Sequence, residues 1–307
     1  MLDSIKHIAR QLAESEEPHV RFKILRNVYQ RPLASREIRI VRDDVAASPL
    51  VSTLLAEWRD GRIVVPPHAR WRGAHWVLYL LADLGCADSD ARLPSLREQV
   101  CAWLLSPQRE EPTCGSVEGH ALHYLHFLQL ADERADALAA RLISWAEGWQ
   151  PRETPASFAQ ALSAIRGLYM HGQQRDCAAS HAAVEHLVER LLARSAFCKS
   201  DCSTPLSADF ISLHYPCYEH ADVLFAVKVL GEVGCATDPR CQPAVQLLKG
   251  KQLADGTFPA ERKYYRPGRS DREGDSLVNW GGTHRTRGNI FVTLDALGAL
   301  RAAGEPF

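Results

Sequence analysis

The segment AVQLLKGKQLADGTFP, residues 244–259, decides the fold because it ends an amphipathic helical pattern in an Asp-Gly turn. Leu247 and Leu248 form the apolar face of that pattern, and Asp255 with Gly256 supplies the turn chemistry. A weaker copy, TLLAEWRDGRIVVP, occupies residues 53–66. Two copies of one helix-and-turn pattern, far apart in one chain, indicate an internal repeat.

The same helical pattern recurs along the chain, with steps of 50, 37, 50 and 56 residues between its leucines. A second set of apolar helical stretches alternates with it, and each of these begins near a polar side chain. The leucine helices are expected at residues 50–58, 100–108, 139–148, 188–195 and 244–252, and the second set begins near His19, His75, His120, Gln160, His220, and Arg287 with Asn289. This alternation predicts a single all-α domain over residues 1–307, a closed array of helical hairpins.

The amino-acid composition argues against a nucleic-acid-binding protein and against a membrane-spanning one. The chain has 307 residues, 46% of them hydrophobic, and a formal net charge of −1, which gives no electrostatic bias toward nucleic acid. No apolar run reaches the roughly 18 residues that a membrane-spanning helix needs. The first residues lack the apolar block of a signal peptide, so we expect a cytoplasmic protein. The nine cysteines are an odd number and are scattered, which favours reduced thiols.

The two turn-containing segments, together with RWRGAHWVLYLLADLG at residues 70–85 and RGNIFVTLDALGAL at residues 287–300, resemble a known repeat. They are similar to the squalene-cyclase and prenyltransferase repeats of the terpenoid cyclase and protein prenyltransferase superfamily. The resemblance covers nearly all of the chain from about His19 onward. It implies an (α/α)6 toroid, in which an outer ring of helices wraps an inner ring. It also implies a central cavity that opens at the N-terminal ends of the inner helices, and a hydrophobic or isoprenoid-like ligand.

The catalytic motifs of that superfamily are missing from this sequence. Neither the DxDD acid motif nor the DDxxD magnesium motif occurs. Protein prenyltransferases hold zinc with an Asp, a Cys and a His. The His lies near the start of the last inner helix, and the corresponding position here is apolar, near Phe291 or Val292. The sequence therefore predicts a divergent relative and no cofactor.

Candidate catalytic side chains gather in HYPCYEHAD, residues 214–222. We expect Pro216 in the first turn of an inner helix, with Cys217 and His220 on one face. His220 and Asp222 are candidate proton donors or acceptors, and Cys217 is a candidate nucleophile. The alternative is a helix start held by hydrogen-bonded polar side chains.

A second group of candidates lies at the start of another inner helix. His120 and Glu118 are candidate acid–base residues, because a carboxylate beside an imidazole raises its basicity; interhelical hydrogen bonding is the alternative. Aromatic rings facing the cavity would stabilise a carbocation, whereas core packing is the default for rings at helical spacing. The candidate substrate-binding residues are His75, Trp76, Tyr79, Tyr124, Tyr218, Arg287 and Asn289.

Two further features have both a functional and a plain interpretation. The spacing C-x3-C followed by H-x2-C makes Cys198, Cys202, His214 and Cys217 candidate zinc ligands, with buried reduced thiols as the alternative. The long polar connection at about residues 261–288 is either a lid over the cavity or a solvated loop.

The leading hypothesis is an enzyme that acts on an isoprenoid or other hydrophobic small molecule by acid–base chemistry in a central cavity. The alternative is a catalytically silent toroid that binds a hydrophobic ligand or a protein partner.

Overall fold

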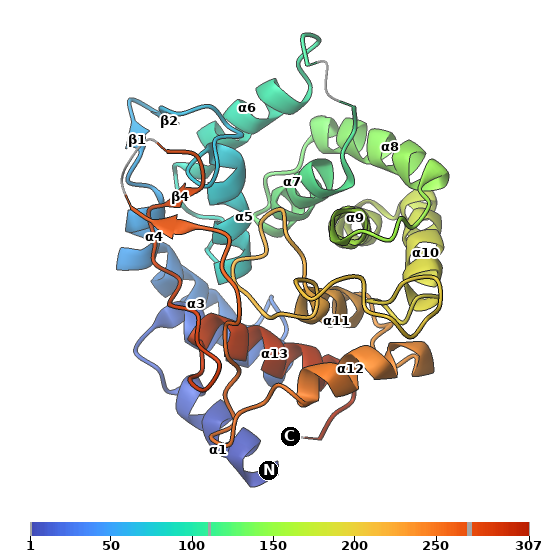
Figure 1. The fold of residues 1–307 in the computed structure, drawn as a ribbon. Helices are drawn as coiled ribbons and strands as arrows, with labels where there is room; N and C mark the ends of the chain where they lie inside the picture. The colour runs from blue at the N-terminus through green and yellow to red at the C-terminus, as the bar shows by residue number, and fades with distance from the viewer. Residues whose placement is uncertain (1, 110–111, 269–271, 307) are drawn as a thin grey trace.

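A computed structural model describes residues 2–109, 112–268 and 272–306 of the chain, and these residues are mostly helical (Figure 1). The α-helices are α1 (Leu2–Ala13), α2 (Pro18–Lys23), α3 (Arg36–Ala46), α4 (Pro49–Leu54), α5 (Ala74–Leu84), α6 (Leu93–Leu104), α7 (Gly115–Phe127), α8 (Glu133–Gly148), α9 (Pro155–Arg175), α10 (Ala178–Leu192), α11 (Val223–Glu232), α12 (Gln242–Lys249) and α13 (Ile290–Ala302). A π-helical turn, η1 (Ile24–Val28), continues α2, and a 3-10 turn, η2 (Pro239–Cys241), precedes α12. The short strands are β1 (Trp58–Arg59), β2 (Arg62–Ile63), β3 (Arg266–Pro267) and β4 (Asp275–Ser276). The all-α class predicted from the sequence is confirmed.

Helices α2, α5, α7, α9, α11 and α13 contact one another in chain order, and α13 returns to contact α2. The helices between them along the chain pack against this group from outside, and Figure 1 shows α6, α8, α10 and α12 at the periphery. These two groups correspond to the two alternating sets expected from the sequence. We call the first group the inner helices.

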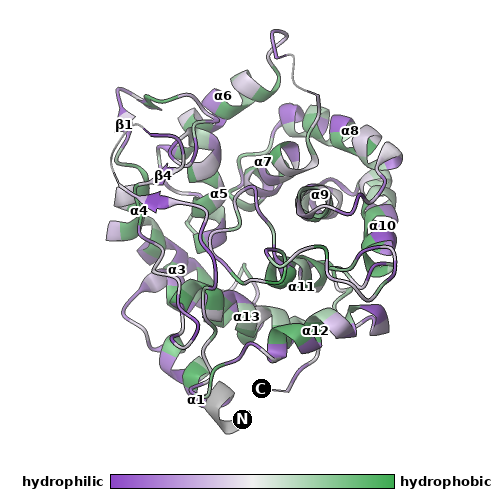
Figure 2. Cartoon of the chain, viewed as in Figure 1, coloured by the Kyte–Doolittle hydropathy of each residue, from purple (hydrophilic) through white to green (hydrophobic). Residues whose placement is uncertain are grey.

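Side-chain burial separates the two groups of helices. All 11 residues of α5 are buried, whereas α8 is 16 residues long and buries only a stripe that includes Leu138 and Leu142. A helix that is apolar all round belongs inside, and one with a single apolar stripe covers a core. Figure 2 shows this contrast between the mainly apolar α11 and the mixed surface of α8. The buried apolar side chains form a contiguous cluster that extends from Ile8 to Ala303.

Two glycines allow α7 and α9 to approach closely. A Cβ atom added at Gly119 would lie 2.4 Å from the carbonyl oxygen of Ser163, and one added at Gly167 would lie 2.4 Å from that of Gly119. Glycine at both positions removes these clashes, so the two backbones pack almost directly against each other.

The segment before α11 differs from the sequence expectation. Pro216 does not begin a helix, because α11 starts only at Val223 with Asp222 as its N-cap. Asp222 accepts hydrogen bonds from the backbone N–H groups of His214 and Phe225, so its carboxylate anchors a loop and caps the helix at once. We call residues 212–222 the plug, since in Figure 1 they lie between the inner helices.

In the parts of the chain that the structure describes, no helix is both long enough and apolar enough to cross a lipid bilayer.

Candidate functional site

The plug packs among the N-terminal parts of the inner helices. The ring of Tyr218 stacks on Trp71 with 4.1 Å between centroids, and Tyr79 Oη donates to the carbonyl oxygen of Cys217 at 2.9 Å. His120 Nε2 lies 2.9 Å from the carbonyl oxygen of Tyr218. The chain therefore fills with its own residues the side on which the family resemblance placed the cavity mouth.

The candidate acid–base residues have structural partners. Glu118 accepts from Arg109 at 2.7 Å and from the backbone N–H of Cys114 at 2.9 Å, so it binds a cation rather than His120. Burial lowers the pKa of His120 to about 4, which makes this imidazole neutral at pH 7. Asp222 is completely buried as a helix cap, whereas His220 is exposed against the ring of Tyr264.

The candidate substrate-binding aromatic residues do come together. His75 Nδ1 lies 3.0 Å from Tyr124 Oη, the Trp76 ring contacts His75 and Tyr218, and the Tyr79 ring contacts His120. All of them are buried and packed against one another.

The other two candidates are separate from this aromatic cluster. Asn289 caps α13 by accepting from the N–H groups of Phe291 and Val292, and Arg287 is exposed.

The connection at residues 261–288 is partly a packed structure. Residues 269–271 lie outside the described part of the chain. Trp280 is completely buried and contacts the rings of Tyr215 and Phe291, and Tyr265 Oη donates to the carbonyl oxygen of Gly281. These contacts join the connection to the plug and to α13.

Sequence reasoning missed a buried group of charges in the centre of the molecule. Lys23 lies 2.6 Å from Asp83 and 2.8 Å from Asp295, and Lys228 lies 2.8 Å and 3.0 Å from the same two carboxylates. We call these four residues the charge ring. Each comes from a different inner helix or its end, α2, α5, α11 and α13. The sequence signal was a single charged residue within the apolar runs of three of these helices, namely Asp83, Lys228 and Asp295.

Further polar groups surround the charge ring. Tyr215 of the plug donates to Asp83 at 2.8 Å, and Arg166 of α9 makes two hydrogen bonds to Glu232, at 2.6 and 2.9 Å. Burial alone would raise the pKa of Asp83, but Lys228, Lys23 and Arg166 hold it well below its usual range. Burial alone would lower the pKa of Lys228, but Asp295 and Asp83 raise it. Both groups are therefore charged in the folded protein at pH 7.

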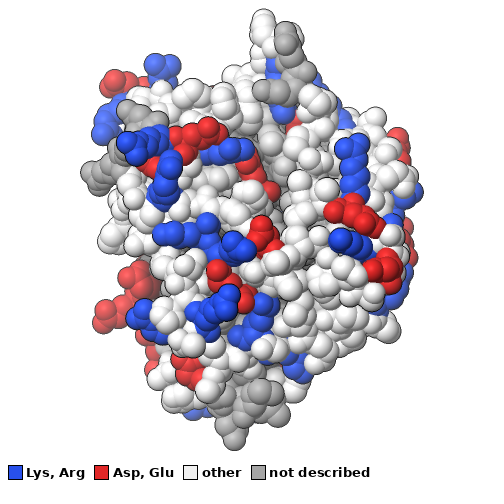
Figure 3. Space-filling model, in the orientation of Figure 1, with Lys and Arg blue, Asp and Glu red and all other residues white. Residues whose placement is uncertain are grey.

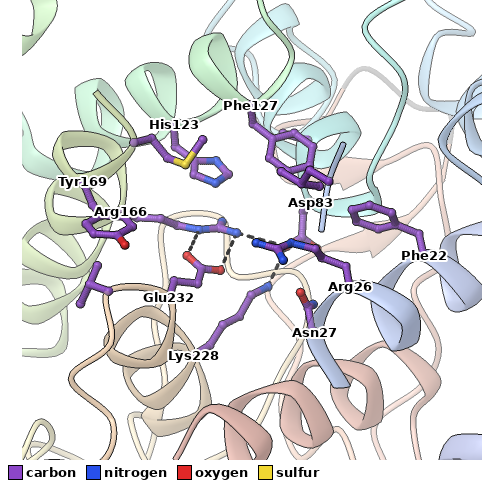
Figure 4. A pocket seen from close by; sticks show the side chains of 14 residues that line it. Phe22, Arg26, Asn27, Asp83, His123, Phe127, Arg166, Tyr169, Lys228 and Glu232 are labelled. Atoms are coloured by element: carbon purple, nitrogen blue, oxygen red, sulfur yellow. Dashed lines mark hydrogen bonds and ion pairs between the residues drawn. The ribbon is translucent and has the colours of Figure 1, made fainter. Parts of the chain in front are cut away.

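A cavity of about 160 Å³ lies beside the charge ring (Figure 4). The lining residues come from the C-terminal halves of inner helices, from η1, and from the segments after η1 and α11, so this cavity lies at the end of the inner helices opposite to the expected mouth. A second pocket of about 180 Å³ shares Arg26, Asn27, Lys228 and Glu232 with it. The first cavity is lined by Phe22, Arg26, Asn27, Leu33, Ala82, Asp83, His123, Phe127, Arg166, Tyr169, Met170, Lys228, Glu232 and Val233.

Two buried polar atoms in residues that line this cavity have no hydrogen-bond partner within the described residues: Arg166 Nη1 and His123 Nδ1. Burial lowers the pKa of His123 well below its ordinary value, so its imidazole is neutral at pH 7. Figure 4 shows Arg166 directed toward Glu232, with Phe127 and Phe22 on another wall. An unpaired buried donor costs about 1–3 kcal/mol, so this wall favours a ligand that brings an acceptor.

A possible metal site lies in the plug. One donor atom each from His214, Cys217 and Asp222 lies within 4.8 Å of the other two, and all three residues are buried. Burial alone would lower the pKa of His214, but Cys217 and Asp222 raise it well above its ordinary value. Within the described residues Cys198 and Cys202 do not belong to this group, so the four-ligand zinc set expected from the sequence is not assembled.

Comparison of the chain with protein-family models, curated proteins and solved structures found no match. Acidic and basic side chains are interspersed on the face shown in Figure 3.

Proposed function

We propose that the chain is an (α/α)6 toroid that binds a small amphipathic molecule, with an oxygen-rich head and an apolar body, at the C-terminal ends of its inner helices. The toroid is supported by the closed succession of contacts from α2 through α5, α7, α9, α11 and α13 back to α2. It is also supported by the placement of the intervening helices outside this group.

The binding proposal depends on one observation: residues with unpartnered buried polar atoms and residues with apolar side chains line the same cavity. Arg166 Nη1 and His123 Nδ1 are buried without partners, and Phe22, Phe127 and Met170 line the same cavity. Ligand sites are mainly apolar with a few convergent polar groups, and this cavity has that composition.

The lining charges favour an anionic head group. Arg26, Arg166 and Lys228 outnumber Asp83 and Glu232 by one positive charge. A carboxylate or phosphate oxygen beside Arg166 Nη1 would satisfy that donor by a charge-assisted hydrogen bond. At about 160 Å³, the cavity is close to the roughly 150 Å³ cavity that holds benzene in an engineered core. The apolar body therefore matches a group of about six carbons, such as one isoprene unit or a short acyl chain.

An acid–base enzyme acting on the same hydrophobic ligand is the second candidate. It is favoured by the neutral imidazole of His123 in the cavity lining, since a general base has to be unprotonated. Binding is the better supported function because Glu118 and Asp222, two of the acid–base residues expected from the sequence, make structural hydrogen bonds outside this cavity.

The proposal is tested by filling the cavity. Met170 is half-buried in the cavity wall, so Met170→Trp would occupy the space of the ligand's apolar body. Wild-type protein and the variant are incubated with cell extract, washed, and analysed by mass spectrometry for retained small molecules. We expect an amphipathic acid or phosphate that the wild type retains and Met170→Trp loses at least tenfold.

The matched control is Leu247→Trp, which enlarges a half-buried residue on α12 that is not among those lining either pocket at the charge ring. This variant should retain the compound as the wild type does. Equal retention by Met170→Trp would contradict the proposal. Recovery of the compound in a chemically altered form would favour the enzyme.

A further inference from the structure

The plug brings three metal-ligating side chains together immediately before α11. His214 Nδ1 lies 3.1 Å from Asp222 Oδ2, and the donor atoms of His214, Cys217 and Asp222 lie within 4.8 Å of one another. Tetrahedral zinc with nitrogen, sulfur and oxygen ligands places its donor atoms about 3.3–3.8 Å apart, as follows from its bond lengths. The His214–Asp222 distance is therefore slightly shorter than that spacing, and the other donor distances are at most 4.8 Å.

Oxygen atoms lie beside both ring nitrogens of His214. Its Nε2 faces the carbonyl oxygen of His220 at 3.1 Å, and its Nδ1 faces Asp222 and, at 3.4 Å, the carbonyl oxygen of Ser212. A neutral imidazole carries one N–H, so it cannot donate to acceptors on both sides. With the ring N–H on Nε2, the lone pair of Nδ1 faces Asp222 at 3.1 Å, the side on which a metal ion would bind.

The surroundings orient two of the three donors, those of Asp222 and His214. The two oxygens of Asp222 each accept a backbone N–H at 2.8 Å, from His214 and from Phe225, which fixes the carboxylate. The carbonyl oxygen of His220 holds the Nε2 atom of His214 at 3.1 Å, which leaves the Nδ1 atom of His214 for a metal ion. Outer partners of this kind are typical of protein metal sites. Asp222 and His214 are almost completely buried, so a cation here would be shielded from water.

We propose that His214, Cys217 and Asp222 bind a zinc ion, which ties the plug to the start of α11. The three protein donors leave a fourth position for a water molecule. The ion would replace the protons of the imidazole and the thiol, so that one divalent charge balances a thiolate and a carboxylate in the protein interior. This site is independent of the cavity beside the charge ring.

The test uses the wild-type full chain first, which avoids variants that fail to fold. Purified protein is depleted of metal with a chelator, checked for retained helicity by circular dichroism, and titrated with Zn²⁺ and with Co²⁺. We expect one Zn²⁺ per chain, a rise in Tm on zinc binding, and a cobalt spectrum with a thiolate-to-metal charge-transfer band. A folded, metal-depleted chain that binds neither ion would overturn the proposal and leave His214 as an imidazolium.

Variants then assign the ligands. Cys217→Ser should abolish the thiolate band, and Asp222→Asn should weaken zinc binding by more than the roughly 10–100-fold that follows loss of an outer partner. Cys202→Ser is the matched control, because Cys202 is an exposed thiol in the hairpin that also contains Cys198. A thiolate band that survives Cys217→Ser but disappears in Cys202→Ser or Cys198→Ser would place the metal elsewhere and overturn the assignment.

Discussion

Lys23 and Lys228 place two ammonium groups in the packed centre of the molecule, where an unpaired charge would be very costly. Each of them contacts both Asp83 and Asp295, so the four charges of the charge ring cancel. A buried network of this kind adds little net stability compared with apolar residues, because desolvation offsets the Coulomb attraction. The charge ring instead favours one arrangement of the helices, the arrangement in which each lysine reaches both carboxylates.

Asp295→Asn tests this balance at a single residue. The substitution preserves the shape of the side chain but leaves two buried ammonium groups facing one carboxylate. Removing one partner of a buried pair costs about 3–5 kcal/mol, and we expect the free energy of unfolding to fall by about 3 kcal/mol. Denaturant unfolding followed by circular dichroism measures the loss.

The control for this prediction is Arg240→Gln, which breaks an exposed contact with Glu189 and should leave the unfolding midpoint unchanged. An Asp295→Asn midpoint equal to that of the wild type would show that the charge ring does not constrain the fold.

Helices α7 and α9 form a contact that depends on backbone shape rather than on side chains. Gly119 and Gly167 face each other across it, and neither position has room for a Cβ atom. Elsewhere the inner helices pack through bulky apolar side chains, as α5 does. The close approach brings Ser163 and His120 within 3.4 Å of each other, so the glycines also position part of the aromatic cluster.

Gly167→Ala should therefore destabilise the protein, although alanine is the better helix former. Its Cβ would lie 2.4 Å from the carbonyl oxygen of Gly119, and overpacking of this kind costs about 1–3 kcal/mol. Gly148→Ala at the end of α8 is the matched control, because a Cβ there meets nothing within 4 Å. Thermal unfolding should show a lower Tm for Gly167→Ala and an equal or slightly higher Tm for Gly148→Ala. Equal Tm values for the two variants would contradict the tight contact.

The molecule as a whole encloses several histidines as neutral groups. Burial lowers the pKa values of His19 and His120 to about 4, and it lowers those of His75 and His123 well below their ordinary value. In the unfolded chain each of them titrates near 6.5. Between these pH values the unfolded chain binds more protons than the folded protein, so stability falls as the pH falls.

We expect the free energy of unfolding to decrease steadily from pH 7 to pH 4.5. Each buried histidine contributes at most about 1.4 kcal/mol per pH unit in this range. The depressed pKa of Asp83 adds a further loss only below about pH 4, where the unfolded carboxylate takes up its proton. Urea midpoints measured across the range test the slope, and His120→Gln should reduce it. A flat profile would mean that these imidazoles are hydrated or already charged in the folded state.

Local sequence was a good guide to the helices and a poor guide to the site. Gly85, with a φ of +82°, ends α5, and Asn289 caps α13, both at places where the residue types favour a helix boundary. The plug was misread because Pro216 suits a helix start, whereas the cap is Asp222. The charge ring was missed because its four pairs are 60, 67, 145 and 272 residues apart along the chain.

Periodic apolar residues, caps and turn glycines act within a few residues of one another, so their effects can be predicted from the sequence. They determine the class of fold and the alternation of buried and covering helices. The positions of the cavity, of the charge ring and of the His214, Cys217 and Asp222 group depend instead on how distant segments pack. A buried charge selects its partner by proximity in the folded interior, and that proximity exists only once the inner helices have packed against one another and against the plug.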